Sequence, residues 1–378
     1  MALIDSTPVH GLAEEAPDCR EKVLDRRRGP SDPLRIALVV PLQGPAGIFG
    51  PSSEFCAELA AEEVNSAGGV LGRPIEFVVV DGGAPPHSVA GEVDLLVSAG
   101  AVDAVIGWHI SSVRKALIPR MADRVPYVYT ALYEGGERAP CVFLAGETPG
   151  RQLRPALAWF ARELGVRRWA VVGDDYVWPR RTAAAARRYL AQIGGVIGEE
   201  VFVALGTETY GDVVRRLGAA APQGVLMLLV GADAVAFNRA FADAGLHETC
   251  VRFSPLMDET IVLGSGAAAT EGLFAAAGFF ETLITADSLD FSARYHRRFG
   301  ALAPVLNSMG ESCYEGVRLL VELFNRAGST DLRQIRESSH GLAYDSPRGP
   351  VHLRGQHLEQ RVFLAAVDGL EFDVLQRF

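Results

Sequence analysis

The feature that most constrains the fold of this chain is an alternation of short apolar runs with longer amphipathic segments. Residues 34–40 are almost continuously apolar, and residues 53–65 follow with apolar side chains at helical spacing. Continuous apolar strands are typical of parallel sheets covered on both faces. The expected strands are 34–40, 75–80, 104–107, 126–129, 169–173, 200–203, 224–230, 251–254 and 273–280, with helices near 53–65, 87–99, 112–122, 151–164, 180–193, 210–219, 233–244, 287–299 and 307–327.

This alternation pauses near Pro149 and then restarts, which predicts an α/β fold of two doubly wound lobes with mainly parallel sheets. The later stretch 349–367 alternates with period two and predicts a β-hairpin. Ligands of doubly wound sheets bind beyond the carboxyl ends of the strands. With two such lobes facing each other, the expected site is the cleft between them.

Charge and composition exclude several classes of partner. The formal net charge is −10 and the isoelectric point is about 5.4, so direct nucleic acid binding, which needs a basic surface, is not expected. No segment offers roughly 18 uninterrupted apolar residues, so we expect no membrane insertion. The cysteines stand far apart without C-x-x-C spacing, which predicts reduced thiols rather than a disulfide framework or a metal site, and no motif indicates a cofactor.

The first 33 residues carry mixed charges and lack an apolar core. We therefore expect a disordered tail at 1–33 and no secretory signal, which predicts a cytoplasmic protein. A periplasmic or cell-surface location remains the alternative if the true start lies upstream.

Polar and aromatic residues follow four of the expected strands. The first group is Trp108, His109 and Ser111, where a serine hydroxyl and the first N–H groups of a helix could bind a carbonyl or carboxylate oxygen. The other groups are Tyr129, Ala131 and Tyr133; Asp174, Asp175, Tyr176 and Trp178; and Leu256, Met257 and Asp258.

Each group has a purely structural alternative. Ser111 or Ser112 could be only a helix cap, and Tyr133 could pack at the lobe junction. Trp178 could lie in the core with Asp174 or Asp175 capping a helix, and capping is the favoured interpretation of Asp258.

Signals of catalysis are weak. Ser112 and Lys115 match the S-x-x-K pattern of serine acyl-transfer enzymes, but the companion motifs S-D-N and K-T-G are absent. A solvated helix face is the favoured interpretation of Arg114 and Lys115. We therefore predict a protein that is not an enzyme, with serine acyl transfer as a remote alternative.

The residues together resemble a known family. The run 34–40, the loop Gly44-Pro-Ala-Gly47, the segment 62–76 with Asp81, and later Tyr295–Gly300 and Tyr314–Leu320 are similar to type I periplasmic-binding-protein-like receptors of the branched-chain amino acid class. The segments 107–115, 133–135, 175–180 and 349–352 most resemble amide and urea receptors, among them the cytoplasmic amide-sensing regulator of the aliphatic amidase operon. This class crosses between lobes three times, which implies an N-terminal lobe of 34–148 plus 280–328 and a C-terminal lobe of 149–279 plus 329–378.

The resemblance also implies site residues. Ser111 takes the position of a serine that binds the polar end of the ligand, Tyr129 that of a tyrosine after the fourth strand, and Tyr176 and Trp178 that of an aromatic pair. His109, Ala131 and Met257 replace a tyrosine and two threonines of the amide regulator. Leu256 stands where amino-acid receptors have a glutamate for the ligand ammonium, which disfavours an α-amino acid, although Asp258 is close enough to supply a charge.

We therefore expect a receptor for a small polar ligand, such as an amide or urea, that reports closure to a regulatory protein as a cytoplasmic sensor. The alternative is the solute-binding component of an ABC transporter for amides, urea or branched-chain amino acids, with a permease as partner. A homodimer is compatible with either hypothesis.

Overall fold

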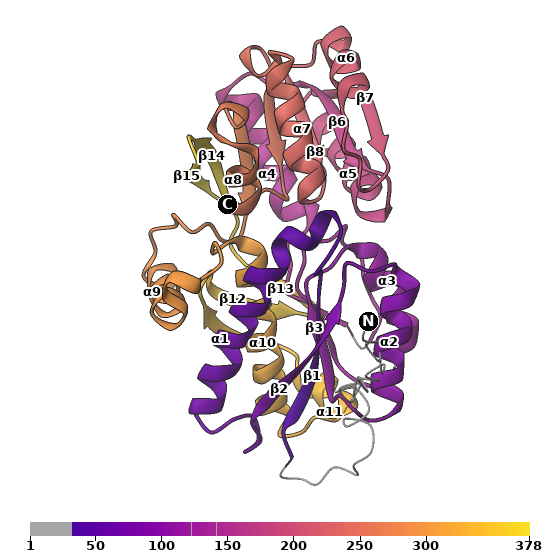
Figure 1. The fold of residues 1–378 in the computed structure, drawn as a ribbon, viewed down its shortest axis with the longest axis vertical. Coiled ribbons are helices and arrows are strands. Elements are labelled where there is room, and N and C mark those ends of the chain that lie inside the picture. The colour runs from indigo at the N-terminus through magenta and orange to yellow at the C-terminus, as the bar shows by residue number, and fades with distance from the viewer. Residues whose placement is uncertain (1–31, 122, 141) are drawn as a thin grey trace, which may run out of the picture.

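Each lobe is built on a twisted, mainly parallel sheet with helices on both faces, as the sequence predicts. The computed structural model describes residues 32–121, 123–140 and 142–378, and its lobes lie one above the other along the longest axis (Figure 1). The predicted tail at 1–33 lies outside the described residues except for Asp32 and Pro33.

The first sheet joins strands from both ends of the chain. Its core is parallel: β1 pairs with β2 on one side and with β3 on the other, and every residue of β1 except Arg35 is buried. Burial on both faces explains the continuous apolar run of this strand. In spatial order the strands are β11 (Ala343–Ser346), β12 (Gly349–Arg354), β13 (His357–Glu359), β5 (Val142–Leu144), β4 (Tyr127–Tyr129), β3 (Ala104–Gly107), β1 (Leu34–Val40) and β2 (Ile75–Asp81).

Helices cover both faces of this sheet, α1 and α10 on one side and α2 and α3 on the other (Figure 1). The helix α9 stands out to one side in the same view. The helical segments of this lobe are η2 (Pro45–Phe49), α1 (Gly50–Ser66), α2 (Pro86–Ser98), α3 (Ser111–Met121), α9 (Ala286–Phe299), η5 (Gly300–Leu302), α10 (Ser308–Ala327) and α11 (Leu332–Ser338).

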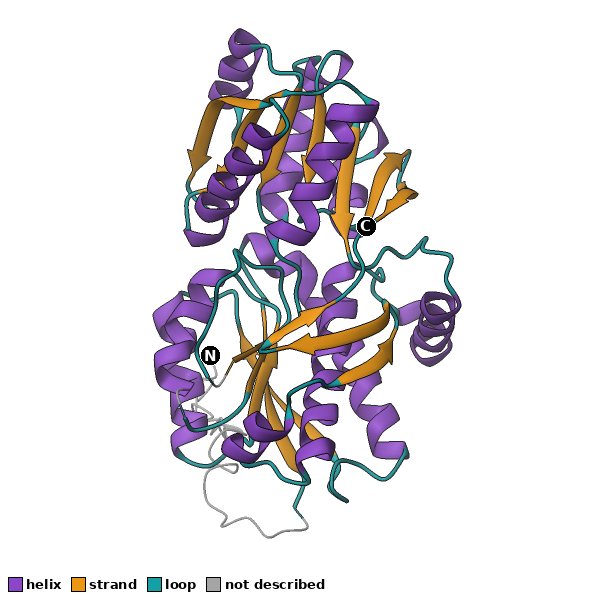
Figure 2. Cartoon of the chain, turned by 180° about the vertical axis from the view of Figure 1, so that it is seen from behind, coloured by secondary structure: helices purple, strands orange, loops and turns teal. Residues whose placement is uncertain are grey.

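The second sheet is parallel except for its last two strands along the chain. Figure 2, which views the molecule from behind, shows helices on both sides of this sheet. Its spatial order is β15 (Glu371–Arg377), β14 (Phe363–Asp368), β10 (Leu273–Ala277), β9 (Val251–Ser254), β8 (Gly224–Leu228), β6 (Arg168–Asp174) and β7 (Val196–Val203). Its helical segments are α4 (Pro149–Glu163), α5 (Val177–Gln192), α6 (Gly211–Ala220), α7 (Ala232–Asp243), η3 (Leu246–Glu248), α8 (Glu259–Ser265) and η4 (Ala267–Ala269).

The chain passes between the lobes three times, after β5, after β10 and after β13. The last passage corrects the expected boundaries, because 329–378 is not all in the second lobe. Strands β11 to β13 join the first sheet, where His357 pairs with Leu144 of β5, and only β14 and β15 extend the second. The predicted hairpin is formed by β12 and β13. The period-two pattern predicted that these segments are strands, but it did not predict which of the two sheets they join.

Candidate ligand-binding site

The carboxyl ends of β3 and β4 in the first lobe face those of β6 and β9 in the second, and one cavity lies between them. Its water-accessible volume is about 10 Å³. Such a space holds roughly one water molecule, so the two lobes are closed on each other. The lining residues are Trp108, His109, Ile110, Ser111, Tyr129, Ala131, Leu132, Tyr176, Trp178 and Leu256.

Most of the residues that the sequence singled out line this cavity, and five do not: Tyr133, Asp174, Asp175, Met257 and Asp258. Met257 is buried without lining the cavity, and Leu256 lines it instead. Asp258 caps α8 by accepting a hydrogen bond from the Ile261 N–H at 3.0 Å, which was the structural alternative for this residue. Burial raises the pKa of Asp258 to about 7. Neither residue is therefore placed to contact a ligand in the closed cleft.

Ser111 begins α3 and its hydroxyl donates to Oε2 of Glu134 at 2.9 Å. The same carboxylate accepts from Nη2 of Arg114 at 2.6 Å. The Arg114 side chain has no exposed surface, which corrects the expected solvated face, whereas Lys115 is half exposed. One turn of helix separates Arg114 from Ser111, so this side chain points inward and its guanidinium lies 4.8 Å from the centre of the Tyr129 ring.

The charges around Arg114 cancel in pairs. The ammonium of Lys115 lies 2.9 Å from Oε2 of Glu137, and that oxygen lies 3.6 Å from Nε of Arg114. Two cations and two carboxylates thus form a neutral cluster behind the cavity wall. The hydrogen-bond partner of Lys115 in this cluster is Glu137.

His109 is buried between two tyrosines. The Tyr129 hydroxyl donates to the backbone carbonyl of His109 at 2.7 Å, and the Tyr127 hydroxyl lies 2.8 Å from Nε2 of the ring. Burial, together with the positive charge of Arg114, lowers the pKa of His109 to about 3, so its imidazole is neutral. Burial raises the pKa of Tyr129 to about 12, so its phenol keeps its proton.

The opposite wall belongs to the second lobe. Tyr176 precedes α5 and is half-buried, while Trp178 in its first turn is almost fully buried, with ring centres 6.2 Å apart. Asp174 does not cap this helix, because its Oδ2 accepts from the Val230 N–H at 2.8 Å. Burial and the neighbouring Asp233 raise the pKa of Asp174 to about 9. The aromatic pair therefore directly follows the end of β6, which the Asp174–Val230 hydrogen bond ties to the end of β8.

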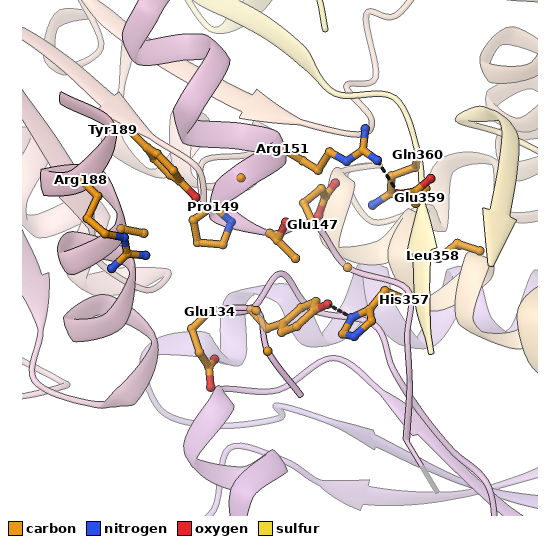
Figure 3. Close-up of a pocket in the computed structure, with 17 residues that line it drawn as sticks. Glu134, Glu147, Pro149, Arg151, Arg188, Tyr189, His357, Leu358, Glu359 and Gln360 are labelled. Atoms are coloured by element: carbon orange, nitrogen blue, oxygen red, sulfur yellow. Dashed lines mark hydrogen bonds and ion pairs between the residues drawn. The ribbon is translucent and has the colours of Figure 1, made fainter. Parts of the chain in front are cut away.

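A second, wider groove opens beside this cavity along two of the inter-lobe passages. It offers about 350 Å³ of water-accessible space. Figure 3 shows Arg188 and Tyr189 of α5 on one side, and Glu134 and His357 of the first lobe on the other. Tyr133, which the sequence left open as a junction residue, stacks on His357 with ring centres 5.9 Å apart.

The described residues hold no cluster of three or more histidine, cysteine or carboxylate side chains that could bind a metal ion. Cys56, Cys250 and Cys313 are buried and unpaired, and the remaining cysteines lie outside the described residues. Within the described ranges, no helix is both long and apolar enough to span a membrane.

A family model described as periplasmic binding protein matches residues 33–371. The chain belongs to this family. Among curated relatives of this periplasmic binding protein, Leu/Ile/Val-binding protein homolog 6 of Brucella melitensis is 24% identical over 352 residues, which are 89% of this chain and 88% of the relative.

Solved structures of similar proteins share the fold of this periplasmic binding protein. A solute binding protein of an ABC transporter from Rhodopseudomonas palustris, in complex with 3,4-dihydroxybenzoic acid, superposes with a TM-score of 0.81 at 23% identity, covering 91% of this chain and 97% of that one. A branched-chain amino acid transporter substrate binding protein from Streptococcus pneumoniae, in complex with isoleucine, gives 0.79 at 16% identity, covering 91% and 99%. At these identities the likeness establishes the two-lobed architecture.

The sequence analysis did not choose Glu134 as a candidate site residue. This residue lines the wider groove, and its carboxylate accepts a hydrogen bond from the Ser111 hydroxyl. The available signal was a carboxylate in the loop after the fourth strand, directly after Tyr133.

Proposed function

We propose that this periplasmic binding protein is the solute receptor of an ABC transporter, which captures a small polar ligand by closing two lobes over it. An amide, urea or related small compound is the ligand class we favour. Such a receptor acts outside the cytoplasm, which is the alternative location considered above.

One observation carries the proposal. Residues from four strand ends, two in each lobe, converge on one cavity whose walls belong to different lobes. A ligand touching Ser111 on one wall and Trp178 on the other makes both contacts only in the closed state. Its binding energy then shifts the equilibrium toward closure.

The relatives favour transport over the cytoplasmic sensor that the sequence suggested first. They are named as Leu/Ile/Val-binding protein homologues and as binding proteins of ABC transporters. Uptake of branched-chain amino acids is less favoured for this chain. Leu256 offers no charge to an ammonium group, and the carboxylate of Asp258 is engaged in capping α8.

Ligand screening with a conformational readout tests this function. We expect at least one member of a panel of amides, ureas, amino acids and aromatic acids to raise the melting temperature, and small-angle scattering to show a more compact protein with that compound. Tyr176→Ala should abolish the response. Tyr189→Ala, on the helix α5 that Tyr176 precedes but outside the cavity lining, is the matched control and should retain it. If no compound raises the melting temperature or makes the protein more compact, the proposal is wrong.

The partner can be tested separately. If the protein serves a transporter, its gene should lie beside genes for membrane permeases and ATPases. Neighbouring genes for an amidase and a regulatory protein would instead favour the sensor.

A further inference from the structure

Two buried carboxyl groups of the second lobe lie in contact with each other. Asp174 ends β6, Asp233 lies in the first turn of α7, and both are almost fully buried. Burial, the charge of Asp233 and a side-chain hydrogen bond between the two groups raise the pKa of Asp174 to about 9. Two ionised carboxylates have no proton to share, so this hydrogen bond requires that one of the pair is protonated.

The same two carboxyl groups hold the backbone of two loops. Oδ2 of Asp174 accepts from the Val230 N–H, after β8, at 2.8 Å. Oδ2 of Asp233 accepts from the Gly206 N–H, after β7, at 2.7 Å. Because β7, β6 and β8 are neighbours in the second sheet, the pair ties together the carboxyl ends of three adjacent strands.

Both of these loops face one residue of the first lobe. A Cβ built on Gly231, next to Val230, would lie 2.1 Å from the carbonyl oxygen of Pro45. A Cβ built on Gly206 would lie 3.8 Å from Cγ of the same proline, which begins η2. The carboxyl pair therefore sits behind the two loops that receive Pro45 when the lobes are closed.

The pair has no compensating cation. Among the described residues, no arginine, lysine or histidine acts on the pKa of either carboxyl group. The other titratable side chains that interact with the pair are Tyr210, before α6, and Tyr176, before α5. Burial and the charges of the two carboxylates raise the pKa of both phenols, so they stay neutral. Loss of the shared proton thus leaves two like charges in a buried place, and the groups must separate.

We propose that Asp174 and Asp233 are positioning residues for lobe closure, which hold the two loops against Pro45 only while the pair keeps its shared proton. This inference rests on the proposed function, because it concerns the closure that traps the ligand. Repulsion in the doubly ionised pair pulls the Val230 and Gly206 N–H groups apart, and the loops then lose their fit to Pro45. The closed state therefore binds the proton more tightly than the open state, and ligand affinity is complete at neutral pH and falls as the pH rises toward 9 and above.

Calorimetric titrations at pH 7.0 and pH 9.5 test this dependence. The probes are acetamide, propionamide, benzamide and urea, none of which gains or loses a proton over this range. For each probe that binds, we expect the dissociation constant to be at least about threefold larger at pH 9.5. Binding at pH 8.5 should also take up a fraction of a proton, which makes the binding heat depend on the ionisation enthalpy of the buffer.

The variant Asp174→Asn separates the pair from other titrating groups, such as Glu311, whose pKa burial raises to about 8. Its amide oxygen can accept from Val230 and its NH₂ group can donate to Asp233, with no proton to lose. The affinity should then change less than about 1.5-fold between the two pH values, and the proton uptake should disappear. Asp233→Asn should behave in the same way. Asp243→Asn, at an exposed position of the same helix α7, is the matched control and should keep the wild-type dependence.

The outcomes separate this inference from the proposed function. Equal wild-type affinities at both pH values overturn the inference, and so does a pH dependence that persists in Asp174→Asn and Asp233→Asn. Both results leave the receptor function standing, which fails only if the whole screening panel gives no response. If Asp174→Asn does not fold, Asp233→Asn decides.

If none of the four probes binds at pH 7.0, small-angle scattering without an added compound decides. A wild-type protein that expands between pH 7.0 and pH 9.5, while Asp174→Asn does not, supports the inference. Equal radii of gyration of the wild type at the two pH values, or the same expansion in the variant, overturn it.

Discussion

The guanidinium of Arg348 lies 3.3 Å from Oε1 of Glu147, and this pair links the first passage between the lobes to the C-terminal part of the first sheet. The same carboxylate oxygen accepts from the Gly278 N–H at 2.7 Å, on the second passage. Nη1 of Arg348 also donates to Oε1 of Gln360, at the third passage, at 2.7 Å. One buried cation thus connects all three segments about which the lobes can move.

Arg348→Met is expected to lower the free energy of unfolding by about 3 to 5 kcal/mol, because it leaves Glu147 and Glu311 buried without their shared counter-charge. Urea titration at pH 7 measures this change. Arg354→Met is the matched control, since its side chain is 82% exposed and its ion pair with Glu359 should contribute less than about 1 kcal/mol. Equal, small losses in both variants would show that the buried network does not stabilise the fold.

A second prediction concerns closure. Gly231 has φ of +51°, and a Cβ built there would lie 2.1 Å from the carbonyl oxygen of Pro45 in the opposite lobe. Gly231→Ala should therefore hold the lobes apart and weaken ligand binding at least about tenfold, because only the closed state contacts the ligand on both walls. Calorimetry with the best ligand from the screen, together with small-angle scattering, measures both effects.

Gly300→Ala separates this steric effect from backbone strain. Gly300 has φ of +53° and ψ of −131°, close to the +51° and −113° of Gly231, but no atom lies within 4 Å of its built Cβ. The alanine there should lower the free energy of unfolding by about 1 to 3 kcal/mol through backbone strain while leaving affinity unchanged. Unchanged affinity in Gly231→Ala as well would mean that the Pro45 contact does not limit closure.

The sequence predicts the strands of this fold better than their partners. β1, β3 and β9 are found where the apolar runs place them, because strands buried on both faces must be apolar throughout. The hairpin β12–β13 and strand β14 follow one another closely but enter different sheets. That choice depends on the pairing of His357 with Leu144 and on the network around Arg348, which are long-range contacts that periodicity does not encode.

The candidate site was also predicted in part: the sequence identified residues at strand ends, but not the contacts between distant segments. Ser111, Tyr129 and Tyr176 were identified because polar residues at strand ends share one edge of a parallel sheet. The resemblance aligned both Leu256 and Met257 with ligand-contacting positions, and in the structure Leu256 lines the cavity whereas Met257 is buried beside it. Arg114 was taken for a surface residue because its partners Glu134 and Glu137 come from a loop some 20 residues later.

Two buried carboxyl groups in the second lobe predict a loss of stability at alkaline pH. The pKa of Asp174, about 9 in the folded protein, lies above the ordinary carboxyl value because of burial and of Asp233. The folded state therefore holds a proton that the unfolded chain releases near pH 4. The stability due to this proton is present at low pH and is lost as the pH rises toward 9, at about 1.4 kcal/mol per pH unit.

Asp174→Asn imitates the protonated acid, because its amide can accept from Val230 and donate to Asp233. Relative to the wild type, this variant should gain about 2.7 kcal/mol of unfolding free energy between pH 6 and pH 8, measured by urea titration at each pH. Asp175→Asn, at the exposed neighbouring position, should show no such gain. A pH-independent difference between Asp174→Asn and the wild type would rule out the shared proton.

His109 predicts the opposite dependence on the acid side. Burial lowers its pKa to about 3, so the folded protein keeps the imidazole neutral while the unfolded chain binds a proton below about pH 6.5. The stability due to this difference is complete above pH 6.5 and is lost as the pH falls toward 3.

His109→Gln removes the titrating group, although it weakens the fold at every pH because the Tyr127 hydroxyl loses its partner nitrogen. The gap in unfolding free energy between wild type and His109→Gln should therefore narrow by about 1.4 kcal/mol per pH unit between pH 6 and pH 4.5. His352→Gln, at an exposed position of β12, controls for the substitution itself. A gap that stays constant over this range would mean that His109 takes up its proton in the folded protein, and that the cavity wall can become positively charged after all.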